Sequence, residues 1–202
     1  MSRFLGKTAL VTGASRGIGE AIARRLAAEG ATVLAAARSA DALAKVVSEI
    51  EAGGGKASAV ALDLANPASI ETAVKAALAA HAEISVLINN AGVTEDNLIL
   101  RMSRESWDRV LSTNLTGVFL LTQAVVKNMV RKRYGRIVNV TSVVGLMGNS
   151  GQANYAASKA GLVGFTKSVA PHLASPYHLV GRLSFACWRK HPMGFQTCVF
   201  VH

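Results

Sequence analysis

The stretch that decides the fold is residues 7–19, with the sequence KTALVTGASRGIG. Its apolar first part, Lys7 to Thr12, predicts a short buried strand. Glycines follow at positions 13, 17 and 19, and the chain then takes on the apolar spacing of a helix. Glycines allow a tight turn and close approach of the backbone to a ligand, and a helix N-terminus attracts anions. The stretch therefore predicts a strand, a phosphate-binding turn and a helix. Because its spacing is G-x-x-x-G-x-G, not the commoner G-x-G-x-x-G, a plain strand-to-helix turn stays an alternative.

The rest of the chain continues the alternation of strand and helix, which is typical of a parallel sheet covered on both faces. Asn66 and Pro67 have the types expected at the cap and first turn of a helix. Right-handed crossovers then predict a doubly wound, Rossmann-type α/β fold. We expect strands near 7–12, 32–37, 57–62, 84–89 and 136–141, and helices near 17–29, 39–52, 67–80, 103–132 and 153–173.

A serine, a tyrosine and a lysine stand at a spacing that suits carbonyl chemistry. Tyr155 and Lys159 are four residues apart, so on a helix they lie on one face. A lysine ammonium beside a phenol lowers the pKa of the phenol, which lets the tyrosine exchange a proton during a reaction. Ser142 follows a predicted strand, and its hydroxyl could hold a carbonyl oxygen. For Tyr155 and Lys159 alone, an ordinary surface helix pair is the alternative.

The end of the second predicted strand bears on the choice of dinucleotide. Ala37 stands where an acidic residue would bind a ribose hydroxyl, and Arg38 follows it. Arg16 lies in the glycine loop. Two guanidinium groups attract a 2′-phosphate, whereas a carboxylate would repel it. These residues favour NADPH or NADP+ over NADH, unless Arg38 is merely exposed.

These features resemble the short-chain dehydrogenase/reductase family over roughly Lys7 to Ala170. Within that family the chain is most similar to the bacterial 3-oxoacyl-[acyl-carrier-protein] reductases of fatty acid biosynthesis. The runs that carry the resemblance are TGASRGIG (12–19), NNAG (89–92), NLTGVF (114–119), TSVVG (141–145) and GQANY (151–155).

The resemblance implies an NADPH-dependent oxidoreductase that reduces a 3-oxoacyl thioester to the 3-hydroxyacyl thioester. Ser142 would hydrogen-bond the carbonyl, Tyr155 would donate the proton, and Lys159 would lower the pKa of the tyrosine and hold the nicotinamide ribose. Asn114, at a local break in its helix, would complete a proton relay through water. Asp63 would accept a hydrogen bond from the adenine. The cofactor-binding residues implied are Gly13, Ser15, Arg16, Gly17, Ile18, Gly19, Arg38, Asp63, Leu64, Asn90, Ala91, Gly92, Tyr155 and Lys159.

Two alternatives to this function stay open. One is a reductase of another ketone or of a sugar alcohol in the same family. The other is a catalytically impaired chain that only binds dinucleotide or partner subunits.

The charge is strongly basic, with a net value of +10, and no acidic residue follows Asp108. Such a balance suits an acidic partner, nucleic acid or an anionic surface. We expect neither nucleic acid nor a membrane as partner, because no nucleic-acid motif is present and no uncharged apolar run reaches the ~18 residues of a membrane span. The resemblance matches Arg133 to a docking contact for acyl carrier protein and implies a homotetramer. A simple complement to a helix C-terminus is the alternative for Arg133.

The last part of the chain departs from the family from about Pro171. Residues 171–202 hold three of the four prolines, four of the five histidines and both cysteines. We therefore expect a Rossmann domain over 1–170 and a divergent tail over 171–202, with the family's last strands missing. The fifth strand would then be exposed as an unpaired edge, where Leu179 to Ala186 or Gln196 to Val201 could pair weakly. An altered reading frame or an evolved end would both explain the tail. The irregular histidine spacing gives no metal site, and a cytoplasmic location is expected because no signal segment begins the chain.

Overall fold

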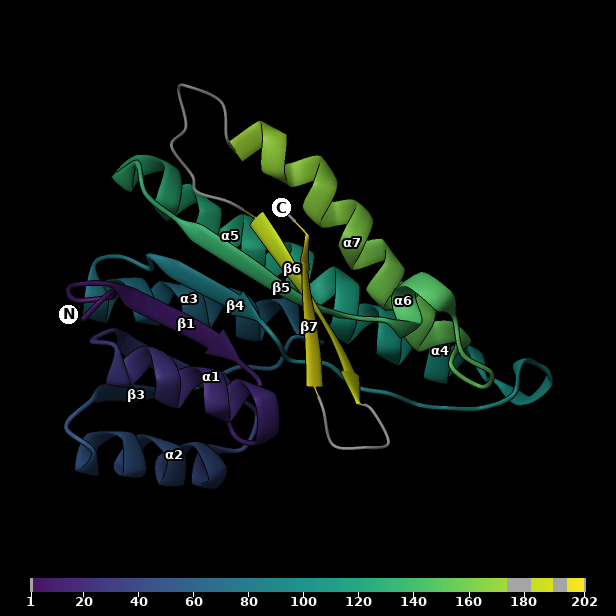
Figure 1. Ribbon diagram of the computed structural model, residues 1–202, viewed down its shortest axis with the longest axis horizontal. Helices are drawn as coiled ribbons and strands as arrows, with labels where there is room; N and C mark the ends of the chain where they lie inside the picture. The colour runs from purple at the N-terminus through teal and green to yellow at the C-terminus, as the bar shows by residue number, and fades with distance from the viewer. Residues whose placement is uncertain (1, 174–182, 191–195, 202) are drawn as a thin grey trace.

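The protein is built on one seven-stranded sheet, seen in a computed structural model that describes residues 2–173, 183–190 and 196–201 (Figure 1). The strand order is β3-β2-β1-β4-β5-β6-β7. Strands β1 to β6 are parallel to their neighbours, and β7 runs antiparallel to β6. Their bounds are Thr8–Thr12, Thr32–Ala37, Lys56–Ala61, Val86–Asn89, Arg136–Ser142, Leu183–Lys190 and Gln196–Val201. The predicted doubly wound fold is confirmed.

Helices cover both faces of the sheet. Residues of α1 (Gly17–Ala28) and α2 (Ala40–Ala52) share one buried apolar cluster with the strands, and α3 (Pro67–His81), α5 (Gly117–Lys132) and α7 (Ala153–Leu173) share another. The helices on one face follow β1 and β2, and those on the other face begin after β3. The connections therefore change face at the boundary between the neighbouring strands β1 and β4. That crossing is where doubly wound sheets bind ligands, at the carboxyl ends of the strands. The shorter elements are η1 (Ile99–Arg101), α4 (Arg104–Leu111), η2 (Ser112–Thr116) and α6 (Val144–Met147).

Local signals explain where several helices begin. The side chain of Asn66 accepts hydrogen bonds from the backbone N–H groups of Ala68 and Ser69 at the start of α3, and Pro67 occupies the first turn. Ser39 caps α2 in the same way by accepting from Ala42 N–H. Both caps satisfy N–H groups that a helix leaves free at its start.

The helix predicted over 103–132 contains a change of winding. The structure has α4, then the π-helical turn η2, then α5, in one continuous rod. By length and composition this rod could cross a membrane. In this fold its apolar face lies in the sheet core, because Leu121, Val125 and Met129 are fully buried there. The rod is therefore explained as a core helix.

The edge of the fifth strand, expected to be open unless a tail segment pairs with it, is paired in this structure by strands that overlap the two segments named from the sequence. Strand β6 pairs parallel with β5 from Ile137 opposite Leu183 to Ser142 opposite Trp188, and β7 pairs with β6. An edge strand presents unpaired N–H and C=O groups, so a following segment of strand-forming residues readily adds to it. Two tail segments therefore cover the edge of β5 in the described backbone. The histidines at 172, 178, 191 and 202 lie outside the residues whose side chains are described.

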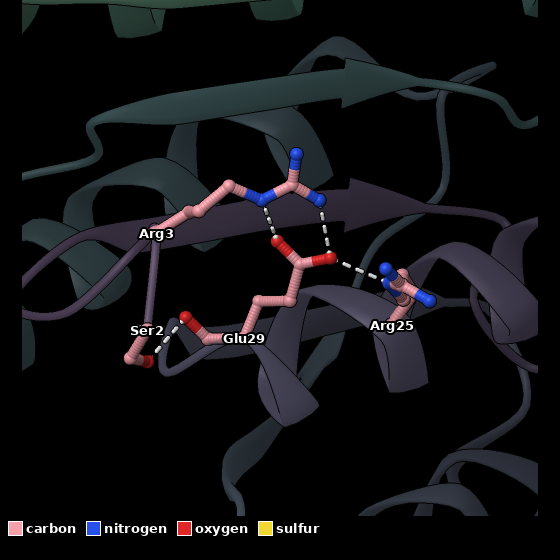
Figure 2. Close-up of polar contacts among 4 residues, drawn as sticks. All are labelled: Ser2, Arg3, Arg25 and Glu29. Carbon is pink, nitrogen blue, oxygen red and sulfur yellow. Dashed lines mark hydrogen bonds and ion pairs between the residues drawn. The ribbon is translucent and has the colours of Figure 1, made fainter.

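The N-terminal segment is held against the end of α1 by Glu29 (Figure 2). Arg3 donates two hydrogen bonds of 2.6 Å to the Glu29 carboxylate, and Arg25 donates one of 2.5 Å. Ser2 Oγ donates to the backbone carbonyl of Glu29 at 2.6 Å. These hydrogen bonds, from Arg3 first and then Arg25, lower the pKa of Glu29 to about 2.

Candidate active site

The glycine loop is closed by contacts that only glycine permits. Gly13 has φ +67°, and a Cβ there would lie 2.9 Å from Asn90 Nδ2. A Cβ on Gly19 would lie 2.2 Å from the carbonyl oxygen of Gly13 and 2.5 Å from Asn90 Nδ2. Loop and first helical turn therefore pack directly on the NNAG segment after β4, which leaves free backbone N–H groups at the start of α1 for an anion.

Thr12 ties the ends of β1 and β4 together beneath this loop. Its hydroxyl donates to Ile88 O at 3.1 Å and accepts from the N–H groups of Asn90 and Ala91, both at 3.0 Å. Asn90 Nδ2 donates in turn to Thr12 O at 3.0 Å. The side chain is almost fully buried, so these bonds fix the relation of the two loops that border the site.

A cavity of about 450 Å³ opens above these loops. It is a size that suits part of a dinucleotide. The predicted cofactor residues line this cavity, except Gly19, Tyr155 and Lys159. Its full lining is Thr12, Gly13, Ser15, Arg16, Gly17, Ile18, Ala36, Ala37, Arg38, Leu62, Asp63, Leu64, Asn90, Ala91, Gly92, Val93 and Thr113.

A second hollow, of about 560 Å³, adjoins the first at its arginine side and is lined by Ser15, Arg16, Arg38, Ser39 and Ala42. The two arginines singled out from the sequence therefore face one space. The N-terminus of α2 lies there as well, and its partial positive charge adds to that of the guanidinium groups. The chemistry of this hollow suits a phosphate group.

Tyr155 and Lys159 lie on one face of α7, as their spacing predicted. Lys159 Nζ is 5.7 Å from the centroid of the Tyr155 ring. The ammonium donates a 2.8 Å hydrogen bond to Val140 O in β5, and the side chain is only 4% exposed. Burial lowers the pKa of Lys159 to about 8. Ser142 ends the same strand, is also buried, and its Oγ accepts from Val144 N–H at 3.2 Å.

Asn114 lies in the π-helical turn, which confirms the local break expected there. Its side chain is fully buried and clamps the backbone of Val93: Oδ1 accepts from Val93 N–H at 2.8 Å and Nδ2 donates to Val93 O at 2.9 Å. Nδ2 also donates to Ser158 Oγ at 3.2 Å. A Cβ on Gly92 would lie 3.2 Å from Asn114 Oδ1 and 3.6 Å from Lys159 Nζ. The NNAG segment, the π turn and α7 thus meet beside Lys159.

Arg133 lies away from this assembly. It caps the far end of α5 with a left-handed backbone, φ +53°. The 16 residues of α5 separate it from the π turn by about 24 Å of helix. Arg133 is exposed on the surface beside Arg131 and Lys132.

Some residues of the site were not among the predicted ones. Thr12 and Val93 act through the hydrogen bonds described above, Ser39 lines the arginine hollow, and Ser158 joins Asn114 to α7. Thr12 begins the run TGASRGIG, and Ser158 lies between Tyr155 and Lys159, so these positions were the available signal. Among residues 2–170, no cluster of histidine, cysteine and acidic side chains could hold a metal ion.

Comparison with known proteins gives the same picture over most of the chain. The family model for short chain dehydrogenases matches residues 7–177. The 3-oxoacyl-[acyl-carrier-protein] reductase of Synechocystis sp. is 53% identical over 176 residues, 87% of this chain and 71% of that protein. The corresponding FabG of Escherichia coli K12 is 52% identical over 172 residues, 85% of this chain and 69% of that protein.

Solved structures agree. A metagenomic short-chain oxidoreductase in complex with NADP superimposes with a TM-score of 0.87 at 39% identity, covering 91% of this chain and 82% of that one. A protein of Sinorhizobium meliloti described as a short-chain alcohol dehydrogenase superimposes with a TM-score of 0.83 at 37% identity. The match covers 87% of this chain and 69% of that one.

Proposed function

Because the chain belongs to the short-chain dehydrogenase/reductase family, we propose that it uses NADPH to reduce a 3-oxoacyl thioester, carried on acyl carrier protein, to the 3-hydroxyacyl thioester of fatty acid biosynthesis. The observation that carries the proposal is the buried Lys159 ammonium, held beside Tyr155 and next to the loops of the dinucleotide cavity. Relatives named 3-oxoacyl-[acyl-carrier-protein] reductase, at 53% and 52% identity, support the substrate.

The residues present fit the cofactor. Gly17 has φ +58° and a Cβ there would meet nothing within 4 Å, so the loop offers a bare, open backbone that a pyrophosphate could approach closely. Arg16 and Arg38 would hold the 2′-phosphate in their shared hollow. Asp63 would face the adenine from the end of the cavity, where one carboxylate oxygen already accepts from Ala65 N–H at 2.9 Å. When bound, NADPH supplies the hydride that is added to the carbonyl carbon.

The side chains of the chain itself would handle the proton and the orientation of the carbonyl. The Ser142 hydroxyl would donate a hydrogen bond to the ketone oxygen, and the Tyr155 phenol would give that oxygen its proton, so that the C=O bond becomes CH–OH. With a pKa near 8, Lys159 is mostly protonated at pH 7. Its positive charge beside the phenol favours the phenolate left after proton transfer.

Asn114 would hold the relay in place. By clamping Val93 and reaching Ser158 it fixes the π turn against the NNAG segment and α7. Water held at this turn would then carry a proton to Lys159 and from there to Tyr155. The Asn114 amide would contribute geometry through its bonds to Val93 and Ser158.

Docking of acyl carrier protein through Arg133, assembly as a homo-oligomer and a cytoplasmic location belong to the same proposal, as does the division into a dinucleotide-binding domain over 1–170 and a tail over 171–202. Support for Arg133 comes from its exposed position and left-handed backbone at the end of α5, a conformation that a non-glycine residue seldom adopts. Because Arg133 is far from Lys159, its replacement by alanine should raise KM for the carrier-bound substrate and leave a small thioester unaffected.

The test is oxidation of NADPH with an acetoacetyl thioester, measured for the wild-type chain and for Tyr155→Phe. Turnover that the variant lacks would support the proposal, and faster turnover with an unrelated ketone would redirect it to another substrate. Binding of NADPH without turnover on any ketone would overturn it in favour of a chain that only binds dinucleotide.

A further inference from the structure

Four buried polar side chains form a hydrogen-bonded network through the core, below the candidate active site. Asn89 Nδ2 in β4 donates to Thr122 Oγ1 in α5 at 3.1 Å and to Asn139 Oδ1 in β5 at 2.8 Å. Asn139 Nδ2 donates to Thr166 Oγ1 in α7 at 2.8 Å. None of the four is more than 3% exposed. A polar group that is buried without a partner destabilises the fold, so these groups hold one another in place.

Thr166, the member of this network on α7, lies on the same face of the helix as the proposed catalytic pair. Tyr155, Lys159, Leu162 and Thr166 are separated by four, three and four residues, which places them on one face of the helix. Lys159 bonds the carbonyl of Val140, and Thr166 bonds the side chain of Asn139, the preceding residue of the same strand. Two adjacent residues of β5 therefore hold one stripe of α7.

The direction of these bonds is fixed. Thr166 uses its own proton on Leu162 O, at 2.7 Å, so its oxygen can only accept, and the Asn139 amide is the donor it meets. Apolar packing of Leu162 is not directional and would let the helix slide or turn. The flexible stem of Lys159 cannot hold the helix either. Nearer the start of α7, Ser158 and Asn154 make directional bonds to Asn114 and to Glu95 O. The Asn139–Thr166 bond is the directional side-chain contact described between α7 and strand β5, and it resists both motions relative to the strand that carries Ser142.

Resting on the proposed function, we propose that Asn139, through Thr166, is a positioning residue that sets where α7 holds Tyr155 and Lys159 relative to Ser142. Asn139 and Thr166 are 0% and 3% exposed and bond one another, Asn89 and Leu162 O within the core, so neither is expected to touch the cofactor. A misplacement of about 1 Å at a reacting group can cost about 100-fold in rate. The effect of losing this bond should therefore fall on the chemical step.

The test compares Thr166→Val with Thr122→Val. The second variant removes a similarly buried hydroxyl from the other end of the same hydrogen-bonded network, on α5. Both variants should unfold at similarly lowered temperatures. Thr166→Val should lower kcat about 10-fold or more, with KM and the Kd for NADPH unchanged. Thr122→Val should keep the kcat of the wild type, and Thr166→Ser, which retains the hydroxyl, should restore it.

A second measurement does not depend on turnover. The titration of Lys159, followed by NMR on protein with labelled lysine, should move from about 8 toward its ordinary value of 10.5 in Thr166→Val, because a loosened helix admits water. In Thr122→Val it should not move. If the wild type turns over no thioester, the proposed function fails and this titration alone decides the positioning role. Equal titrations in the two variants, or a Thr166→Ser variant that behaves like Thr166→Val, would overturn it.

Discussion

The two halves of the described chain bury different kinds of side chain. Up to Ile84, the buried polar residues are Thr8 and Thr12, and the core around α1 and α2 is built from alanine, valine, leucine and isoleucine. From Ser85 to Ala170, buried polar groups are frequent and include Lys159, Asn114 and Asn139. The first half can bind a dinucleotide mainly with backbone N–H groups, helix ends and surface arginines. In the proposed reaction the second half does the chemistry with side chains, so it must bury and pair them.

The largest effect should come from removing the buried cation of the second half. Burial depresses the pKa of Lys159 from 10.5 to about 8, a difference that corresponds to about 3 kcal/mol. The folded state therefore carries this cost below pH 8 and loses it as pH rises from about 8 to 10.5. Lys159→Met should be more stable than the wild type at pH 7 by up to about 3 kcal/mol, yet inactive.

Urea unfolding of both proteins between pH 6.5 and 10.5 measures this. The stability advantage of Lys159→Met should shrink across the upper part of that range. An advantage that is absent at pH 7, or constant with pH, would show that the lysine is not held charged at a cost to stability.

A comparably large effect is expected in the first half from a single methyl group. The Cβ of Gly19→Ala would meet the backbone of Gly13, so loop and helix must separate. Overpacking of this kind costs about 1–3 kcal/mol, which corresponds to roughly 10- to 100-fold in the Kd for NADPH. Fluorescence titration of NADPH measures it. Gly164→Ala is the control, because a Cβ there meets nothing within 4 Å; equal affinities of the two variants would contradict the tight loop.

A smaller effect should separate the two forms of the cofactor. Arg38→Ala removes a charged hydrogen-bond donor from the hollow beside Ser39. This should raise the Kd for NADPH by about 10- to 100-fold and leave the Kd for NADH unchanged. The ratio of the two Kd values reports this. If the binding of NADPH and of NADH weakens equally, Arg38 stabilises the conformation of the loop and does not bind the 2′-phosphate.

The smallest effect concerns the surface carboxylate that anchors the N-terminus. Hydrogen bonds from Arg3 and Arg25 lower the pKa of Glu29 from 4.5 to about 2, so its stabilising contribution is present above pH 4.5 and is lost as pH falls toward 2. Glu29→Gln should lower the melting temperature slightly at pH 7 and match the wild type near pH 2. Thermal melts at the two pH values, with and without salt, measure it; an equal difference at both would exclude the ion pairs as its cause.

The sequence predicted the first half better than the second. Strand, loop and helix over 7–29 follow from glycines and apolar spacing, which act locally, and the structure agrees to within a residue or two. Tyr155 and Lys159 were also found locally, as a helical pair. The Asn139–Thr166 bond joins residues 27 apart, and the paired residues of β5 and β6 are 46 apart, so no local spacing could fix these contacts. The resemblance placed Asn114 at a local break in its helix, but its hydrogen bonds to Val93 could be seen only in the fold.

The most direct test of the division between a binding half and a chemical half uses one variant and two readouts. NADPH is titrated into wild type and Tyr155→Phe, and hydride transfer to an acetoacetyl thioester is then followed in a single turnover on the same samples. The account predicts equal Kd values for NADPH and a loss of about 100- to 10,000-fold in transfer rate for the variant. A variant that transfers hydride at the wild-type rate, or that fails to bind NADPH, would contradict it.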